Sequence, residues 1–415
     1  MTQQLAVADP EETEGVRLLV PSIDEADPEL SIVIPALNEE KTIADFVDWC
    51  HQGLLAAGIR GEVLIVDSSS DRTSERAVAR GARVLRVPKR GLGRAYIDAL
   101  PYIRGRYVLM GDADCTYDFR QLKPFVDRLH EGYEFVMGSR WKGSIEPGSM
   151  PGLHRYLGTP LTTWVLNVVY SSRFSDIHCG MRGITRDALE RMDLQSQSWE
   201  YASEMVLKSV HMRLRTAEVP VRFLRDREGR LSHHKRAGWF SPFHAAWINL
   251  KATFVYGAEF FTLKPGLLLL ALGLLLTVPL SLGPLSIGRL HFSLHWMLLG
   301  LTLITLGLQS FYVGCLAQVL HDYTGAARRR WLRVFPYTRT VLLSGVAFVI
   351  GLGLAGLLLS DYVRSDLTLS STDRIPYLGV LGLALVIGAF LSFTFILILH
   401  AMSLRIEGVR RLRTQ

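Results

Sequence analysis

Two aspartates, Asp112 and Asp114, lie one residue apart directly after a short apolar run at residues 107–110. Such a run is typical of a buried parallel strand, and open α/β sheets bind ligands beyond the carboxyl ends of their strands. Two desolvated carboxylates at this edge repel each other unless a cation lies between them. Carboxylate oxygens in small number suit Mg²⁺ or Mn²⁺, which also bind substrate phosphates. The sequence therefore predicts a divalent-cation site, with a turn carrying two solvated aspartates as the alternative.

The elements that would position this pair alternate between strand and helix. Strands are predicted at residues 30–35, 62–67, 82–87, 107–110 and 219–224. With helical spacing between them, this order predicts an α/β fold with a mostly parallel sheet. The first four strands are followed by Asn38 and Glu39, by Asp67, by Lys89, Arg90, Gly91 and Gly93, and by the aspartate pair. Amides, acids and a glycine turn at a helix start can contact a base, a ribose and a phosphate, which indicates a nucleotide-diphosphate site.

The composition divides the 415 residues into two parts. Hydrophobic residues make up 49% of the chain, and from about residue 265 onward Leu, Gly, Val and Ile dominate. The net charge of +7 would suit nucleic acid, anionic lipid or phosphate. No aromatic-rich nucleic-acid module is apparent and basic residues cluster near the apolar part, so we expect lipid and phosphate ligands and no nucleic acid. The four cysteines match no zinc or redox motif.

Four apolar segments, at residues 265–287, 292–320, 338–360 and 375–402, approach or exceed the length that crosses a bilayer, although Pro279 and Pro284 could end the first early. Arginines gather after the second segment and in the C-terminal tail. The positive-inside rule then predicts an integral membrane protein, in the cell membrane if the source is prokaryotic, with both termini and the catalytic domain in the cytosol. Few charges lie within the spans, which favours a membrane anchor over a transporter core. Glycines in the third span allow close helix contact, so a homo-oligomer formed through these helices stays an open alternative.

Two further segments complete the predicted organisation. Residues 1–29 are acidic and polar, which predicts a disordered lead-in before a catalytic domain at residues 30–236. Aromatic residues recur at intervals of three and four within residues 240–254, which indicates interfacial amphipathic helices at residues 237–263, before a transmembrane domain of four helices at residues 264–415. The alternative is that this aromatic stripe packs on the catalytic domain.

Seven motifs in order resemble family-2 glycosyltransferases with the GT-A fold, and more closely the polyprenyl-phosphate (dolichol-phosphate) glycosyltransferases. They are PALNEE at residues 35–40, VDSSSD at 66–71, GLGRA at 91–95, DAD at 112–114, MGSR at 137–140, DIHCGMR at 176–182 and EYASEM at 200–205. The resemblance covers about residues 30–261. It departs at residues 68–70, where the family often has Asp-Gly-Ser, and at residues 232–234, where Ser-His-His replaces Ser-Lys. The first departure leaves the identity of the nucleotide base open. The second makes the positive charge near residue 233 depend on pH.

The resemblance implies a role for each motif. The nucleotide would be bound by Pro35, Asn38, Glu39, Asp67, Arg90, Gly91 and Gly93. Asp112 and Asp114 would hold Mg²⁺ or Mn²⁺ against it. The acceptor phosphate would be bound by Ser139, Arg140, Arg182, His234 and Lys235. The catalytic residues would be Asp112, Asp114, Arg140 and Asp176. Among them, Asp176 would orient the acceptor.

The charges of the implied substrates indicate a mechanism. A lipid monophosphate is already an anionic nucleophile near neutral pH and needs no strong general base. Arginines and the metal would offset its repulsion from the nucleotide sugar, a UDP-hexose or GDP-mannose. We therefore predict inverting transfer of one sugar to polyprenyl phosphate. A polysaccharide synthase is disfavoured because no Gln-x-x-Arg-Trp motif occurs, and a lipid-linked sugar flippase with a non-catalytic nucleotide fold is disfavoured by the intact aspartate pair.

Overall fold

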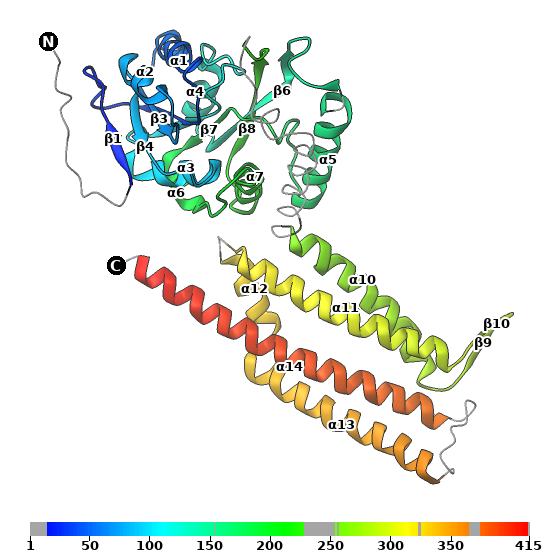
Figure 1. Cartoon of the computed structure of the whole chain (residues 1–415). Helices are drawn as coiled ribbons and strands as arrows, with labels where there is room; N and C mark the ends of the chain where they lie inside the picture. The colour runs from blue at the N-terminus through cyan, green and yellow to red at the C-terminus, as the bar shows by residue number, and fades with distance from the viewer. Residues whose placement is uncertain are drawn as a thin grey trace. The chain divides into compact units, whose positions relative to one another are not determined.

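The computed structural model describes residues 15–152, 154–227, 254, 257–322, 325–364 and 374–413. The chain forms two compact units, Met1–Val255 and Tyr256–Gln415. A sheet with helices on both faces is the basis of the first unit, and the second unit is mainly helical (Figure 1).

Four parallel strands form one half of the sheet in the first unit. They are β2 (Leu30–Ala36), β3 (Gly61–Asp67), β4 (Arg83–Arg86) and β5 (Tyr107–Met110). Each lies within one residue of its predicted bounds, and the predicted α/β fold is confirmed. Their order across the sheet is β4-β3-β2-β5. The chain therefore runs outward from β2 to β4 and returns to β5 on the other side of β2, which makes the β2–β5 boundary the topological switch point.

The other half of the sheet contains strands that are less evident from the sequence. β7 (Arg182–Thr185) runs antiparallel to both β5 and β6 (Phe135–Ile145), and β8 (Thr216–Phe223) runs parallel to β6. Only β8 corresponds to a predicted strand. β7 lies between two strands that both precede it in the chain, so its pairing is long-range and leaves no local periodicity to read.

Helices pack on both faces of this sheet. α1, α2 and α4 lie on one face, and α3, α6 and α7 lie on the other (Figure 1). The bounds are Ile43–Ala57 (α1), Thr73–Ala79 (α2), Leu92–Ala99 (α3), Lys123–His130 (α4), Thr159–Tyr170 (α5), Arg186–Met192 (α6) and Tyr201–His211 (α7). A π-helical turn at His154–Gly158 leads into α5, and a 3₁₀ turn at Leu100–Tyr102 follows α3.

Burial of the parallel strands on both faces explains their continuous apolar sequences. Every residue of β5 is buried, and so are all residues of β3 after its first. α1 buries a stripe that includes Phe46, whose ring meets Phe119 edge-on with 4.9 Å between centroids. This core fixes where each strand ends, and therefore fixes the edge at which the polar residues gather.

The predicted disordered lead-in over residues 1–29 needs correction. Arg17–Leu19 form β1, which pairs antiparallel with β4. Farther along, Asp24 accepts two hydrogen bonds from Arg104, at 2.7 and 2.9 Å. The physical reason is that β4 would otherwise present an unpaired edge to solvent, and this segment covers it. Residues 1–14 lie outside the described residues.

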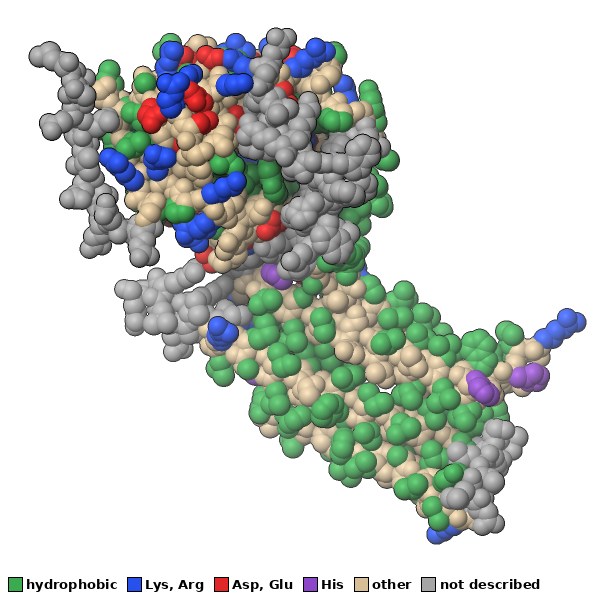
Figure 2. Space-filling model, viewed as in Figure 1, with side chains coloured by type: hydrophobic (Ala, Val, Ile, Leu, Met, Phe, Trp, Pro, Cys, Tyr) green, Lys and Arg blue, Asp and Glu red, His purple; other side chains and the backbone are tan. Residues whose placement is uncertain are grey.

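Among the described residues of the second unit, four helices are long and apolar enough to cross a membrane: α10 (Ala258–Leu280), α11 (Leu294–Leu320), α13 (Tyr337–Arg364) and, within α14 (Arg374–Arg413), residues Ile375–Arg405. A short basic helix, α12 (Ala326–Val334), separates the second and third. Hydrophobic side chains cover much of the visible helical surface (Figure 2). The first helix ends at Leu280, as the prolines suggested, and Leu285–Ile287 instead form a small hairpin with Leu290–Phe292.

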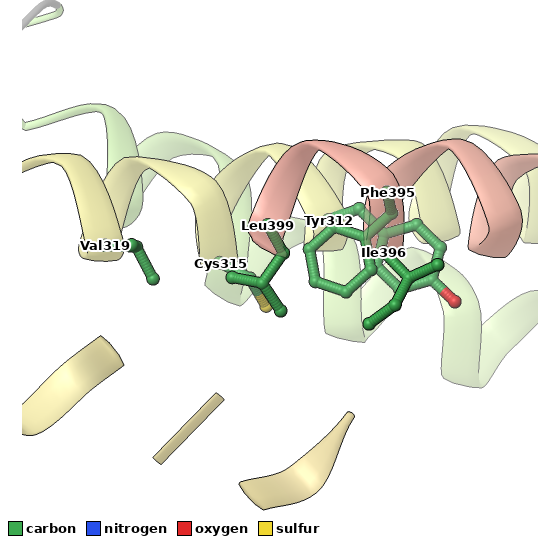
Figure 3. Close-up of a cluster of buried hydrophobic side chains, with 6 residues drawn as sticks. All are labelled: Tyr312, Cys315, Val319, Phe395, Ile396 and Leu399. Carbon is green, nitrogen blue, oxygen red and sulfur yellow. The ribbon is translucent and has the colours of Figure 1, made fainter. Parts of the chain in front are cut away.

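Glycines and aromatic rings hold these helices together. A Cβ at Gly273 of α10 would lie 2.6 Å from the Ile304 backbone nitrogen of α11, so this pair of helices packs with backbones in close approach. Tyr312 of α11 stacks on Phe395 of α14 at 4.2 Å between centroids, within a buried cluster that also includes Cys315 and Leu399 (Figure 3). The predicted interfacial helices at residues 237–263 fall largely outside the described residues, and the last of these residues, from Ala258 on, belong to α10 instead.

Candidate active site

The strand ends on either side of the switch point lie at a common edge. In the strand register Ala36 of β2 pairs with Asp67 of β3, and Val33 of β2 pairs with Met110 of β5. The residues that follow β2, β3 and β5 therefore leave the sheet at neighbouring positions. Open α/β sheets bind their ligands at such a position.

Asp112 and Asp114 lie at this edge and are both half-buried. Asp114 Oδ1 accepts hydrogen bonds from the Thr116 N–H at 2.9 Å and from Thr116 Oγ1 at 2.5 Å. Cys115 adopts a left-handed backbone (φ 59°) that makes the turn possible. Gly180, which is distant in sequence, lies close to Asp112 in space. A Cβ at Gly180 would lie only 2.5 Å from Asp112 Oδ2. Only glycine fits at position 180 without displacing that carboxylate.

The donor set at this edge fits a hard divalent cation. No group of three His, Cys, Asp or Glu residues suited to a metal occurs among the described residues. A closed site of the zinc type is therefore not built there by these residues. Two half-exposed carboxylates instead match Mg²⁺ or Mn²⁺, which keep water ligands and bind phosphates of a substrate.

Two buried tyrosines contact the backbone around the aspartate pair. Tyr96 donates a hydrogen bond to the Gly111 carbonyl at 3.1 Å, and the Tyr117 hydroxyl accepts one from the Gly180 N–H at 2.9 Å. Burial is the main cause that raises the pKa of both phenols well above the ordinary value, and the charge of Asp112 raises both further. These hydroxyls stay neutral and fix the backbone around Asp112.

Asn38 and Glu39 close the end of β2 against the end of β3. The Asn38 N–H donates to Ser69 Oγ at 2.7 Å, and the Asn38 side-chain oxygen accepts from the Ser70 N–H at 3.0 Å. Asn38 is exposed, whereas Glu39 is buried and its carboxylate accepts a hydrogen bond from Thr42. Of the two, only Asn38 is exposed to a ligand.

Asp67 is also buried, although the resemblance implies that it contacts the base. Its Oδ1 accepts from the Ser69 N–H at 2.9 Å, and its Oδ2 accepts from the Ser74 hydroxyl. Both oxygens thus hold the loop that follows β3. Pro35, one residue before the end of β2, is half-buried.

The two glycines of the basic turn are required by packing against a distant segment. Gly91 has φ 115°, and a Cβ there would lie 2.2 Å from the Gln197 carbonyl oxygen. A Cβ at Gly93 would lie 2.1 Å from the Ser196 carbonyl oxygen. Arg90, predicted to bind the nucleotide, forms a surface ion pair with Asp98 at 2.9 Å.

That distant segment, residues 195–198, is held by a buried ion pair whose role the sequence did not indicate. Glu204 accepts hydrogen bonds from the backbone N–H groups of Gln195 and Ser196 at 2.9 and 2.8 Å. Lys208 lies 2.5 Å from the same carboxylate, and both side chains are buried. The spacing of four residues on α7 was the available signal, because it places an acid and a base on one helix face.

Arg140 and Asp176 form a buried bidentate pair. Arg140 Nε donates to Asp176 Oδ2 at 2.7 Å and Nη2 donates to Oδ1 at 2.8 Å, and the Arg140 N–H donates to Oδ2 at 3.0 Å. Burial alone would raise the pKa of Asp176, but the hydrogen bonds and charge of Arg140 outweigh it and hold that pKa below its ordinary value. Asp176 is therefore a poor proton acceptor and a good orienting group for Arg140.

The other predicted acceptor residues lie in different surroundings. Ser139 is fully buried, with its hydroxyl 2.6 Å from Ser175 Oγ. Arg182 is buried too, and its three guanidinium nitrogens donate to the carbonyls of Cys179, Ala202 and Ile177 at 2.8–2.9 Å. Both side chains support the backbone near Asp176. His234 and Lys235 lie outside the described residues.

A cavity of about 340 Å³ opens beside Arg140. Its lining comes from β6 and from the turn before α5, and includes Trp141, Arg155 and Tyr156. The sequence prediction missed Arg155, which follows no strand end and belongs to none of the seven motifs. The segment at residues 176–182 connects this cavity with the aspartate pair, since Asp176 binds Arg140 and Gly180 adjoins Asp112.

Comparisons with known proteins match both parts of the chain. Residues 31–193 match glycosyl transferase family 2, and residues 321–403 match the glycosyltransferase family 2 C-terminal transmembrane region. The chain is 35% identical over 386 residues to the low-salt glycan biosynthesis hexosyltransferase of Haloferax volcanii, covering 91% of each chain. It is 29% identical over 204 residues to the dolichyl-phosphate hexose transferase of that organism, covering 48% of this chain and 85% of the relative.

The chain is also similar to a solved structure. Glucosyl-3-phosphoglycerate synthase from Mycobacterium tuberculosis, in complex with Mn²⁺, UDP-glucose and phosphoglyceric acid, is 24% identical with a TM-score of 0.41. The alignment covers 55% of this chain and 81% of that one. The family matches and the full-length relative decide the assignment: the chain belongs to glycosyltransferase family 2 and is an integral membrane protein with the C-terminal transmembrane region of that family.

Proposed function

We propose that the protein transfers one hexose from a nucleotide sugar, a UDP-hexose or GDP-mannose, to polyprenyl phosphate with inversion at the anomeric carbon. The observation that carries this proposal is the half-exposed pair Asp112 and Asp114 at the switch point of a membrane-anchored family 2 chain. Support also comes from two relatives, one named a hexosyltransferase and one a dolichyl-phosphate hexose transferase.

The donor would bind along the carboxyl edge of the parallel strands. Asn38 is exposed beside the loop that Asp67 supports, so the base and ribose would lie over this loop. The pyrophosphate would lie near the turn at Gly91 and the aspartate pair. Asp112 and Asp114 would hold a divalent cation, which would offset the charge that develops on the departing nucleoside diphosphate.

The acceptor phosphate would bind in the cavity beside Arg140. Asp176 occupies Nε and Nη2 of Arg140, which leaves Nη1 for a ligand. Arg155 lines the same cavity and would supply a second positive charge. Two arginines that face one phosphate would offset its repulsion from the donor pyrophosphate.

These positions indicate a single displacement. A phosphate oxygen of the acceptor forms the new bond to the anomeric carbon, and the bond from that carbon to the nucleoside diphosphate breaks with its electron pair on the departing oxygen. The dianionic acceptor carries no proton that must be removed, which fits an Asp176 held ionised by Arg140. Arg140 would position the nucleophile and Asp176 would position Arg140.

The arginines of α12 and of the C-terminal part of α14 support a cytosolic location for this chemistry. Residues 328–330 and 410–413 then lie on the same side as both termini and as the catalytic domain, proposed at residues 30–236. The segment predicted as interfacial, from residue 237 up to the start of α10 at Ala258, would connect it to the transmembrane helices.

The test is transfer of radiolabel from UDP-glucose, GDP-mannose and UDP-N-acetylhexosamines, each supplied separately, to polyprenyl phosphate by purified full-length protein. Expected is an organic-soluble product from one donor that disappears with EDTA and returns when Mg²⁺ or Mn²⁺ is added back. A product that forms fully in EDTA would contradict the metal site. No lipid product from any donor, with folded protein and metal present, would contradict the acceptor.

A further inference from the structure

α5 and the turn before it carry an apolar stripe on the outside of the first unit. Leu157, Leu161, Trp164 and Val168 recur at intervals of four, three and four, which places them on one face of the helix. Their exposed fractions lie between 42% and 63%. Hydrophobic side chains gather along the edge of the first unit where α5 lies (Figure 2).

The opposite face of α5 is already used for packing. Thr159, Thr163, Leu166, Val169 and Tyr170 are buried against the rest of the unit. The helix is therefore largely apolar on both faces, a pattern typical of a helix that is buried all round. Single exposed apolar residues such as Leu55 on α1 are ordinary, but a continuous helical stripe marks an interaction surface.

The charges around the stripe indicate which partner covers it. Residues 147–175 contain no aspartate or glutamate. Arg155 precedes the helix and the exposed Arg173 follows it. Tyr156 and Trp164 add exposed aromatic rings of the kind that favour the membrane interface. Two copies of the chain that met through this face would bring like charges together, whereas an anionic bilayer surface would attract them.

We propose that α5 lies on the membrane surface, with its apolar stripe at the boundary of headgroups and acyl chains and with Arg155 and Arg173 among anionic headgroups. A bilayer is available as the partner, because the described part of the same chain carries four helices able to cross a membrane. Arg155 also lines the cavity beside Arg140, so this docking would hold that cavity at headgroup height. The inference rests on surface and charge and is independent of the proposed transfer reaction.

Site-directed spin labelling of the full-length protein tests this docking. The four native cysteines are buried, so labels can be placed at Leu161→Cys and Val168→Cys. Leu55→Cys, at an exposed apolar position on α1, is the matched control. The protein is placed in nanodiscs of phosphatidylcholine with phosphatidylglycerol, and collisions with oxygen and with a water-soluble nickel complex are measured. We expect high oxygen and low nickel accessibility at positions 161 and 168, and the reverse at position 55.

Two outcomes would overturn the proposal. One is nickel accessibility at positions 161 and 168 as high as at position 55. The other is spin–spin broadening at position 161 that disappears on dilution with unlabelled protein, which would show a second copy on this face. A second variant keeps the test independent of the labels: Trp164→Glu should raise nickel accessibility at position 168 severalfold, and Leu55→Glu should leave it unchanged.

Discussion

The two halves of the sheet in the first unit use their charged residues in different ways. In the parallel half, Asp112 and Asp114 stay half-exposed at the edge. In the other half, Arg182 is buried among carbonyl groups, and Arg140 is locked to Asp176 beside a cavity. A charged residue at a strand end is thus a candidate ligand where its side chain keeps part of its surface exposed, as Asp112 and Asp114 do. The same rule separates Asp112 from Asp67 within the parallel half.

The largest expected effect comes from removing the exposed acids. Asp114→Ala and Asp112→Asn should each lower the transfer rate by about 100-fold or more, as happens when a group that stabilises developing charge is lost. Since both residues are half-exposed, thermal unfolding should change little. Asp127→Asn on α4, an exposed acid, is the matched control and should keep full activity. A folded Asp114→Ala protein with normal activity would remove the distinction between the two halves.

Breaking the buried pair should affect both stability and activity. Asp176→Asn leaves Arg140 without its partner charge, and we expect a loss of about 3–5 kcal/mol in the free energy of unfolding together with reduced transfer. The double variant Arg140→Met/Asp176→Leu should regain most of the stability but not the activity. Denaturant unfolding and transfer assays on the same preparations separate the two effects. Activity in the stable double variant would show that Arg140 only supports the fold.

The same pair predicts a pH dependence of stability at low pH. The pKa of Asp176 is lower in the folded protein than its ordinary value, so its stabilising contribution is complete above the ordinary carboxyl value of about 3.9. It is lost as pH falls below that value toward the folded pKa. Melting curves across this range should fall less steeply for the double variant than for the native protein. If melting temperature fell equally steeply with pH in the two proteins, the Arg140–Asp176 pair would not be the source of this pH dependence.

A smaller effect should follow from filling the space at the basic turn. Gly93→Ala forces the Ser196 carbonyl to move, which we expect to destabilise the protein by about 1–3 kcal/mol and to raise KM for the donor. Gly152→Ala, where a Cβ would meet no atom within 4 Å, is the control. If both variants behave alike in unfolding and in kinetics, the contact between residues 91–93 and 195–198 does not shape the donor site.

The smallest expected effect on activity concerns His178, beside Asp176. Burial, with Arg140 adding to it, lowers the pKa of His178 from 6.5 to about 4. Because the unfolded chain takes up this proton first, stability should fall as pH drops from about 6.5 toward 4. His178→Gln should flatten melting temperature in this range and leave the pH profile of transfer above pH 7 unchanged. A profile that shifts there would give His178 a role in the reaction.

Much of the parallel half could be predicted because its signals are local. Buried parallel strands such as β2 and β3 appear as mostly apolar runs, and polar residues stand at or just after their ends, Asn38 after β2 and Asp67 at the end of β3. The turn at Asp112 and Asp114 follows directly from this pattern. Membrane helices are equally evident, because each needs about 20 apolar residues in sequence.

The rest depends on contacts between distant segments. β7 begins with a buried arginine and is inserted between β5 and β6, which no periodicity indicates. The bidentate pair joins residues 36 positions apart, and Gly93 meets Ser196 across an even longer separation. The resemblance implied ligand roles for Asp67, Ser139 and Arg182 from their places in the motifs, whereas the structure buries all three. How much of a side chain remains open to a cavity or to solvent is a property of the whole fold.

The central claim is tested most directly by the mass of the lipid product. Purified full-length protein in liposomes would be given polyprenyl phosphate, the active nucleotide sugar and a divalent cation, and the lipids and released nucleotide would be analysed together. We expect one hexose on each modified polyprenyl phosphate and one nucleoside diphosphate released per hexose transferred. A polymer, a free sugar, or nucleotide release without a glycosylated lipid would contradict it.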